Sequence, residues 1–127
     1  MQNLILIGLG GFIGSVARYL FSGYVQQLAS GSFFPVGTAT VNIVGCFIIG
    51  FLSQLAEARG AFSPEARVLV FVGVLGGFTT FSTFSNETVN LFRSGESTAA
   101  LFNLGLQIIG GLGAVWLGRT VAYLIWG

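Results

Sequence analysis

The chain has 127 residues, of which 54% are hydrophobic and only 7% are charged. Soluble domains carry about 25% charged residues, so this composition excludes an ordinary soluble protein and is typical of an integral membrane protein. A hydrocarbon layer about 30 Å thick takes about 20 helical residues to cross, which leaves room for about four crossings and no soluble domain beside them. We therefore expect one transmembrane domain over residues 1–127.

Charged side chains are absent from four long stretches of the sequence. The segments SGYVQQLASGS, EARGAFSPE and RSGES separate these stretches and are polar and rich in Gly and Ser, which favours turns. An all-α membrane protein with four transmembrane helices follows. The predicted spans lie at about residues 3–22, 35–55, 64–92 and 98–126. Ser63 and Pro64 suit the start of the third span, since they offer a hydroxyl cap and a proline at the first helical position.

The first span begins MQNLILIGLGGFIGS, without a basic residue or an A-x-A cleavage site. We interpret it as a permanent helix and not as a signal peptide. Its glycines are similar to a dinucleotide-binding turn, but the first acidic residue, Glu57, lies too far along the chain to bind a ribose. Helix packing explains the same glycines: Gly10 and Gly14 share a helix face, and Gly73 and Gly77 repeat the spacing.

The third span contains the polar segment GGFTTFSTFSNE, residues 76–87. Gly76 and Gly77 weaken a helix, and the hydroxyls of Thr79 and Thr80 can hydrogen-bond to backbone groups that a break leaves free. We therefore expect this helix to be broken near its middle. Irregular backbone at membrane depth must be buried in protein or line a polar cavity, where its carbonyls can coordinate a cation.

Phe81 and Phe84 follow three residues apart, on one helix face, beside the hydroxyls of Ser82 and Thr83. The edge of a phenyl ring is positive, so a pair of edges along a narrow path favours an anion without holding it as a fixed charge would. Ordinary aromatic packing is the alternative interpretation.

Three amide side chains lie inside the other spans. Asn42 offers two N–H donors that can replace water around an anion. Asn103 and Gln107 are four residues apart and point the same way, so they can continue a track of donors. For each, the alternative is an interhelical hydrogen bond that contributes about 0.6 kcal/mol.

Arg18 and Glu87 are the ionisable residues nearest the membrane interior, and such residues are functional candidates. Arg18, near the end of its span, either extends toward the interface or draws anions into an aqueous vestibule. Glu87 lies deeper; beside an anion path it must be protonated, paired or hydrogen-bonded, and it is a candidate gate.

The five arginines divide almost evenly between the two membrane sides. Alternating spans place Arg59, Arg67 and Arg119 on one side, and Arg18 and Arg93 on the other. Because basic residues near span ends set orientation, so even a division predicts insertion in both orientations and an antiparallel, dual-topology homodimer. The alternative is that five arginines are too few to decide.

The segments GGFTTFSTFSNE, GTATVNIVGCFIIG and GGFIGSVARY together resemble the CrcB or Fluc family of microbial fluoride channels, and the resemblance covers nearly the whole chain. It implies a dual-topology homodimer with two antiparallel pores that passively exports cytoplasmic fluoride across the bacterial inner membrane and relieves fluoride toxicity. Family members often carry a tyrosine and serines along the fourth span, where this chain has Asn103 and Gln107.

The resemblance also implies roles for individual residues. Phe81 and Phe84 would contact fluoride with their ring edges, Asn42 would be a donor in the pore, and the backbone carbonyls of Gly76 and Thr79 from both subunits would hold a structural sodium ion. Arg18 would sit at a vestibule and Glu87 beside the pore. The fluoride pore is thus expected to be lined by Phe81, Phe84, Asn42, Ser82, Thr83, Glu87, Asn103 and Gln107.

Other classes of protein fit the sequence less well. A small dual-topology, proton-coupled transporter needs a carboxylate in its cavity, and Glu87 is the one candidate. An enzyme is not expected, because the chain has no histidine, no aspartate and no cluster able to activate a nucleophile. Nucleic acid is not expected as a partner, since the net charge is only +1.

Overall fold

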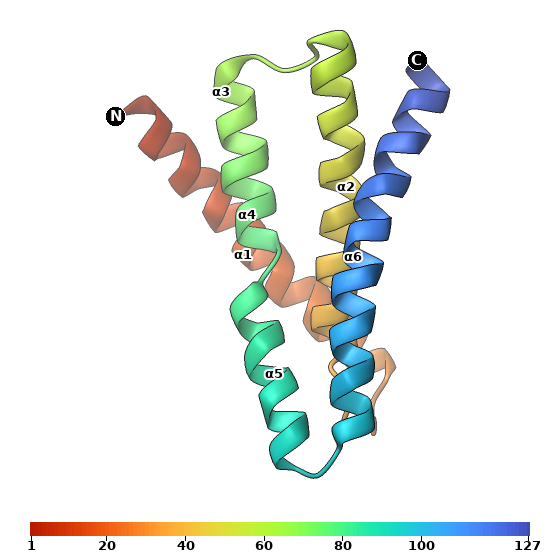
Figure 1. Cartoon of the computed structure of the whole chain (residues 1–127). Coiled ribbons are helices and arrows are strands. Elements are labelled where there is room, and N and C mark those ends of the chain that lie inside the picture. Colours follow the sequence, from red (N-terminus) through yellow and green to blue (C-terminus); the bar gives the residue numbers. More distant parts are fainter.

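The computed structural model describes all of residues 1–127, and every regular element in it is a helix (Figure 1). The helices are α1 (Gln2–Leu28), α2 (Val36–Arg59), α3 (Pro64–Arg67), the π-helical segment η1 (Val68–Leu75), α4 (Gly76–Phe78), α5 (Phe81–Arg93) and α6 (Ser97–Trp126). The segments α3 to α5 follow one another along a single span, so the chain has four stretches long and apolar enough to cross a membrane. This confirms the prediction of an all-helical protein with four spans.

Two helices run further than predicted. α1 continues to Leu28 and α2 to Arg59, six and four residues beyond the expected ends. The polar segment after residue 22 was expected to turn, but the side chain of Gln26 stabilises it as helix: its Nε2 donates to the Phe34 carbonyl (3.1 Å), and its Oε1 accepts from the Gly37 amide (3.0 Å). α2 ends at Gly60, whose left-handed backbone (φ 57°) suits glycine.

The third span begins where the sequence predicts. Ser63 is the N-cap of α3, and its hydroxyl accepts a hydrogen bond from the Ala66 amide (3.1 Å). Pro64 occupies the first helical turn, where its missing N–H costs nothing.

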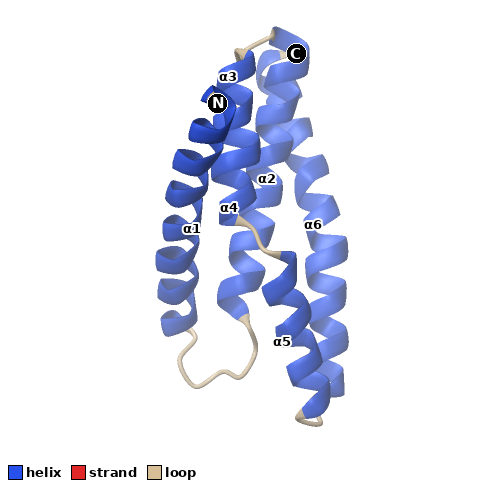
Figure 2. Ribbon diagram, turned by 90° about the vertical axis from the view of Figure 1, so that its left-hand side faces the viewer, coloured by secondary structure: helices blue, strands red, loops and turns tan.

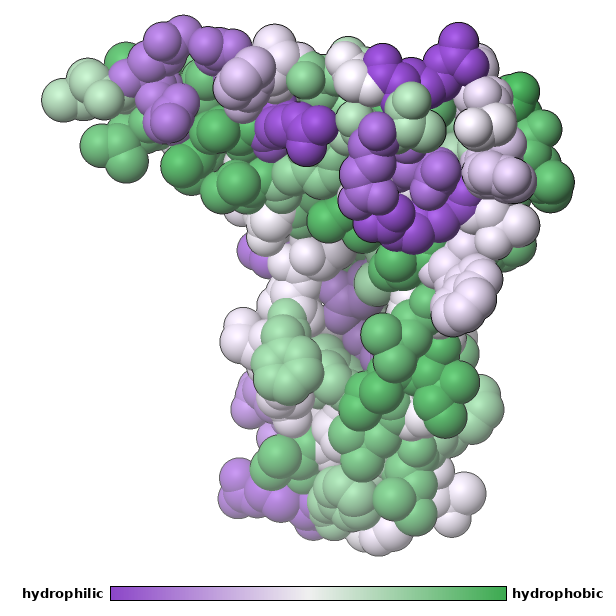
Figure 3. Space-filling model, turned by 45° about the horizontal axis from the view of Figure 1, so that its top comes forward, coloured by the Kyte–Doolittle hydropathy of each residue, from purple (hydrophilic) through white to green (hydrophobic).

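The helices form two closely packed pairs, with α5 beside them. α2 packs along α6, and α1 packs against η1 and α4. In Figure 2, α5 continues below α4 after a short non-helical connection and lies beside α6. Only 21 of 127 residues are buried, and large apolar side chains are exposed along the first, third and fourth spans. Figure 3 shows these hydrophobic residues over the flanks and hydrophilic residues gathered over one end, as a membrane-spanning protein requires.

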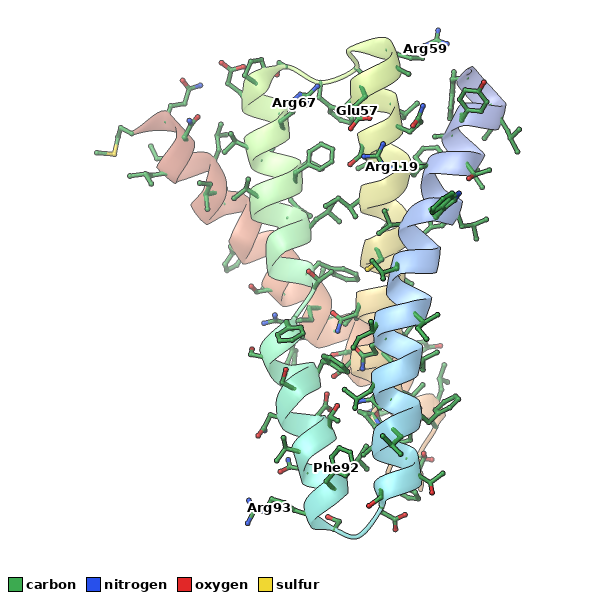
Figure 4. The ribbon with its side chains drawn as sticks, in the orientation of Figure 1. Glu57, Arg59, Arg67, Phe92, Arg93 and Arg119 are labelled. Carbon is green, nitrogen blue, oxygen red and sulfur yellow. The ribbon has the colours of Figure 1, made fainter.

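Charged side chains mark the two ends of the molecule. At one end Arg119 forms a two-pronged ion pair with Glu57 (2.9 and 3.1 Å), and Arg59 donates to the Trp126 carbonyl (2.8 Å). Arg67 lies at this same end, and Arg93 lies at the opposite one (Figure 4). These four arginines lie at the ends where alternating spans predict them.

Glycines allow α1 to touch the third span backbone to backbone. A Cβ on Gly10 would lie 2.6 Å from the Leu69 carbonyl oxygen and 2.8 Å from the Gly73 Cα, and one on Gly77 would lie 2.8 Å from the Gly11 carbonyl oxygen. A Cβ on Gly14 would overlap the Val74 carbonyl. The prediction that these glycines serve helix packing is therefore confirmed: they leave room for the backbone of the neighbouring helix.

We expect Gly10→Ala to lower the stability of the folded chain by about 1–3 kcal/mol, because the added methyl group meets backbone that cannot move aside. Thermal unfolding in detergent micelles measures the effect. Gly8→Ala is the matched control, since nothing lies within 4 Å of a Cβ there. Equal unfolding temperatures for the two variants would contradict the packing described for Gly10.

Candidate functional site

Two extended residues separate α4 from α5 in the middle of the third span. Thr79 has φ −97° and ψ 158°, and Thr80 has φ −151° and ψ 116°. Gly76 and Gly77 themselves remain helical. The Thr79 hydroxyl donates to the Leu75 carbonyl one turn back (3.1 Å), and the Thr80 hydroxyl caps α5 by accepting from the Thr83 amide (3.2 Å).

The side chain of Asn42, on α2, pairs with the backbone of Thr80. Its Oδ1 accepts from the Thr80 amide (2.8 Å), and its Nδ2 donates to the Thr80 carbonyl (3.0 Å). A backbone N–H can only donate, so this pairing fixes which end of the Asn42 amide is oxygen. Both polar groups of an extended residue at membrane depth are thereby satisfied without a helix.

The same hydrogen bonds leave two carbonyls without their usual partners. In a continuous helix the Thr80 amide would donate to Gly76, and the Thr83 amide to Thr79. Here the first donates to Asn42 and the second to the Thr80 hydroxyl, and no hydrogen bond joins either amide to its usual carbonyl. The carbonyl oxygens of Gly76 and Thr79 are therefore available as ligands.

A row of amides continues from Asn42 into α6. Asn42 Nδ2 also donates to Gln107 Oε1 (2.7 Å), and Gln107 Nε2 donates to Asn103 Oδ1 (2.8 Å). Asn103 is fully buried, and its Nδ2 donates to the Thr88 hydroxyl (2.9 Å).

The row returns to α5 through Thr88. Its hydroxyl donates to the Phe84 carbonyl one turn earlier (2.8 Å). Thr88 was not among the predicted site residues; the signal for it in the sequence is its spacing of four residues from Phe84, which places both on one helix face.

A cavity of about 360 Å³ lies beside the extended residues and opens at the surface of the chain. Six predicted site residues contribute to its wall. They are Asn42, Gly76, Thr79, Phe81, Phe84 and Gln107. The rest of the wall is mostly small or apolar, including Gly45 and Cys46, so polar groups face the cavity at a few places only.

The two phenylalanines meet at this cavity. Their ring centroids are 5.6 Å apart and their planes are inclined by 63°, so an edge of one ring faces the other. Phe84 is buried, whereas Phe81 is 76% exposed. Within the single chain, nothing covers the outer face of Phe81.

Thr80 also lines a second cavity, of about 160 Å³. Arg18 and Thr83 line it together with Ser22 and Thr38, and Thr80 is shared with the first cavity. The structure therefore places the predicted vestibule arginine next to the threonines that precede and begin α5.

The remaining predicted residues lie apart from the main cavity. Ser82 is exposed, with its hydroxyl 3.4 Å from that of Thr80. Glu87 lines a third cavity of about 480 Å³ together with Gln26 and Glu96, and its Oε1 is buried without a hydrogen-bond partner. Asn103 lines none of these three cavities.

Comparison with known proteins places the chain in a family. Residues 5–119 match the model of the CrcB-like protein family, described as Camphor Resistance (CrcB). The chain is 50% identical to the fluoride-specific ion channel FluC of Desulforapulum autotrophicum over 98% of each chain. It is 42% identical to FluC of Nitratidesulfovibrio vulgaris over 98% of this chain and all of that one.

The protein is thus an all-helical, multi-pass membrane protein. It belongs to the CrcB family. The relatives it matches along nearly their whole length are named as ion channels and not as enzymes.

Replacing Asn42 with the isosteric leucine should destabilise the fold, because it leaves the partly buried Thr80 amide and carbonyl without their partner. Each unpaired buried group costs about 1–3 kcal/mol. Thermal unfolding in detergent measures the loss, with Asn86→Leu as control, since Asn86 is exposed. An Asn42 variant as stable as the control would contradict the pairing.

Proposed function

We propose that the protein is a passive, fluoride-selective channel that exports cytoplasmic fluoride from bacterial cells and relieves fluoride toxicity. The observation that carries this proposal is the cavity at the interrupted third span, where the tilted Phe81–Phe84 pair and the amides of Asn42 and Gln107 share one wall. We infer that the ion is fluoride because relatives of the chain are named as fluoride-specific ion channels.

The wall of the cavity suits a small, strongly hydrated anion. Positive ring edges and N–H groups replace water without a fixed positive charge that would trap the ion. Both Nδ2 hydrogens of Asn42 already have acceptors, so a fluoride beside Asn42 shares them in three-centre hydrogen bonds. Gln107 continues this polar side of the pore, and Asn103 is buried behind it.

Arg18 and the hydroxyls of Ser82 and Thr83 form the approach to the pore in this proposal. Arg18 raises the local anion concentration from its small cavity, and Thr80 lines both that cavity and the main one. Glu87 lies later on α5, in the wall of the cavity of about 480 Å³. In this proposal it borders the ion path and is a candidate gate.

The functional unit is an antiparallel, dual-topology homodimer with two pores in the bacterial inner membrane. Two features support a second copy against this face: the main cavity is open at the surface, and Phe81 lies uncovered beside it at mid-membrane. The arginines at the two ends are nearly balanced in number, which allows both orientations.

A structural sodium ion fits the carbonyls of Gly76 and Thr79. Hard cations bind oxygen ligands, and these two oxygens have lost their usual backbone donors. When bound, sodium supplies positive charge that neutralises the carbonyl dipoles at the centre of the dimer. The chain itself keeps Thr79 and Thr80 extended through the hydrogen bonds of Asn42, and this leaves the two carbonyls free for the ion.

Fluoride efflux from liposomes containing the purified protein tests the function, with chloride efflux as the comparison. Fast fluoride release with little chloride release is expected. If folded, dimeric protein releases no fluoride, the channel proposal falls, and proton-coupled transport through Glu87 is the alternative to test.

Phe81→Ile should slow fluoride efflux by about two- to tenfold, because it removes a ring edge and preserves bulk. Phe12→Ile is the matched control: Phe12 is an exposed α1 residue away from the cavity. Dimer content, from size-exclusion chromatography, should be unchanged in both variants. Equal efflux from the two would contradict a role for the ring edge.

Gly76→Val should disrupt the dimer and its response to sodium while the single chain still folds. Within the chain, a Cβ on Gly76 meets only the Phe71 carbonyl, at 3.8 Å, so the first added carbon has room in the single chain. Cross-linking in sodium and in sodium-free buffer measures this. Gly113→Val, with nothing within 4 Å of its Cβ, is the control, and equal dimer yields for both would count against a close-packed centre.

A further inference from the structure

α5 packs less extensively against its neighbours than the other long helices do. α2 packs closely on α6, and α1 on η1, whereas α5 has its main backbone neighbour in α6 alone. The two extended residues before α5 also interrupt the helical hydrogen bonds that would tie it to α4. The position of the phenylalanine pair at the start of α5 must therefore be fixed by other contacts.

The row of amides from Asn42 to Thr88 supplies such contacts at both ends of the first turn of α5. One end of the row pairs with the Thr80 backbone, and the other reaches the Phe84 carbonyl. Between these ends the row passes through α2 and α6. It thus joins three helices around the phenylalanine pair.

The direction of every bond in the row follows from one fixed group. The Thr80 amide must donate, so Asn42 Oδ1 faces it and Nδ2 faces Gln107. Gln107 then presents oxygen to Asn42 and nitrogen to Asn103. Each amide holds its neighbour in one of its two possible orientations.

Asn103 cannot contact an ion in the main cavity directly and can influence it only through the row of hydrogen bonds. It is completely buried and does not line the main cavity, although Gln107 does. Its only side-chain partners are Gln107 and Thr88. A buried amide with such partners orients other groups and does not bind an ion from the pore.

We propose that Asn103 and Gln107 are positioning residues: through their chain of hydrogen bonds they hold the Asn42 amide against Thr80 and so fix the place of Phe81 and Phe84. This inference rests on the proposed channel function for its consequence, but the hydrogen-bonded arrangement itself does not need fluoride. Asn103 and Gln107 are consecutive members of one row of hydrogen bonds, so the loss of either side chain breaks the same row.

The first test is spectroscopic and independent of transport. In protein labelled with ¹⁵N at asparagine and threonine, Gln107→Met should shift the Asn42 side-chain amide signals and the Thr80 backbone amide signal. Gln27→Met is the matched control, since the Gln27 side chain is exposed. Unmoved Asn42 and Thr80 signals in a folded Gln107 variant would overturn the proposal, even if the wild-type protein passes no fluoride.

The second test is a double-mutant cycle on fluoride efflux with Asn103→Leu, Gln107→Met and both together. Each single change should slow efflux by about tenfold, as expected when a buried hydrogen bond is lost. The double variant should be no slower than Gln107→Met alone, because residues in series are strongly coupled. Independent effects that multiply in the double variant would overturn the proposal.

Discussion

The pairing of the Asn42 side chain with the Thr80 backbone is the interaction on which the rest of the site depends. A polar backbone group in lipid must find a partner within the protein, and two consecutive extended residues remove the usual helical partners. Asn42 replaces them with one side chain from a neighbouring helix. The diverted Thr80 amide then frees the Gly76 carbonyl, and the extended backbone allows Phe81 to start a new helix beside an open cavity.

Two kinds of glycine contact support this arrangement from either side. Gly10 and Gly14 bring α1 into backbone contact with η1 and α4, which anchors the part of the third span before the interruption. Gly50 and Gly118 do the same between α2 and α6, which carry Asn42 and Gln107. Both amides therefore stand on a closely packed helix pair, and the less closely packed α5 is held against that pair.

Much of the architecture follows from the sequence because apolar length and the positions of charged residues are local signals. The four spans and the Ser63 cap are of this kind. The continuation of α1 to Leu28 could not be predicted locally, since it depends on bonds from Gln26 to Phe34 and Gly37 across a turn. The partner of Thr80 could not be predicted locally either, because Asn42 is 38 residues away. The sequence indicates only that Asn42 is a donor in the pore or forms an interhelical hydrogen bond.

The most direct test of this account is a solid-state NMR measurement on protein in lipid bilayers, labelled with ¹⁵N in the asparagine side chains and ¹³C at threonine carbonyls. The account predicts a dipolar coupling between the Asn42 side-chain nitrogen and the Thr80 carbonyl carbon, consistent with the 3.0 Å hydrogen bond. It should vanish in Asn42→Leu and persist in Asn86→Leu. A folded wild-type protein without this coupling would show that something other than Asn42 holds the third span open, and would contradict the account.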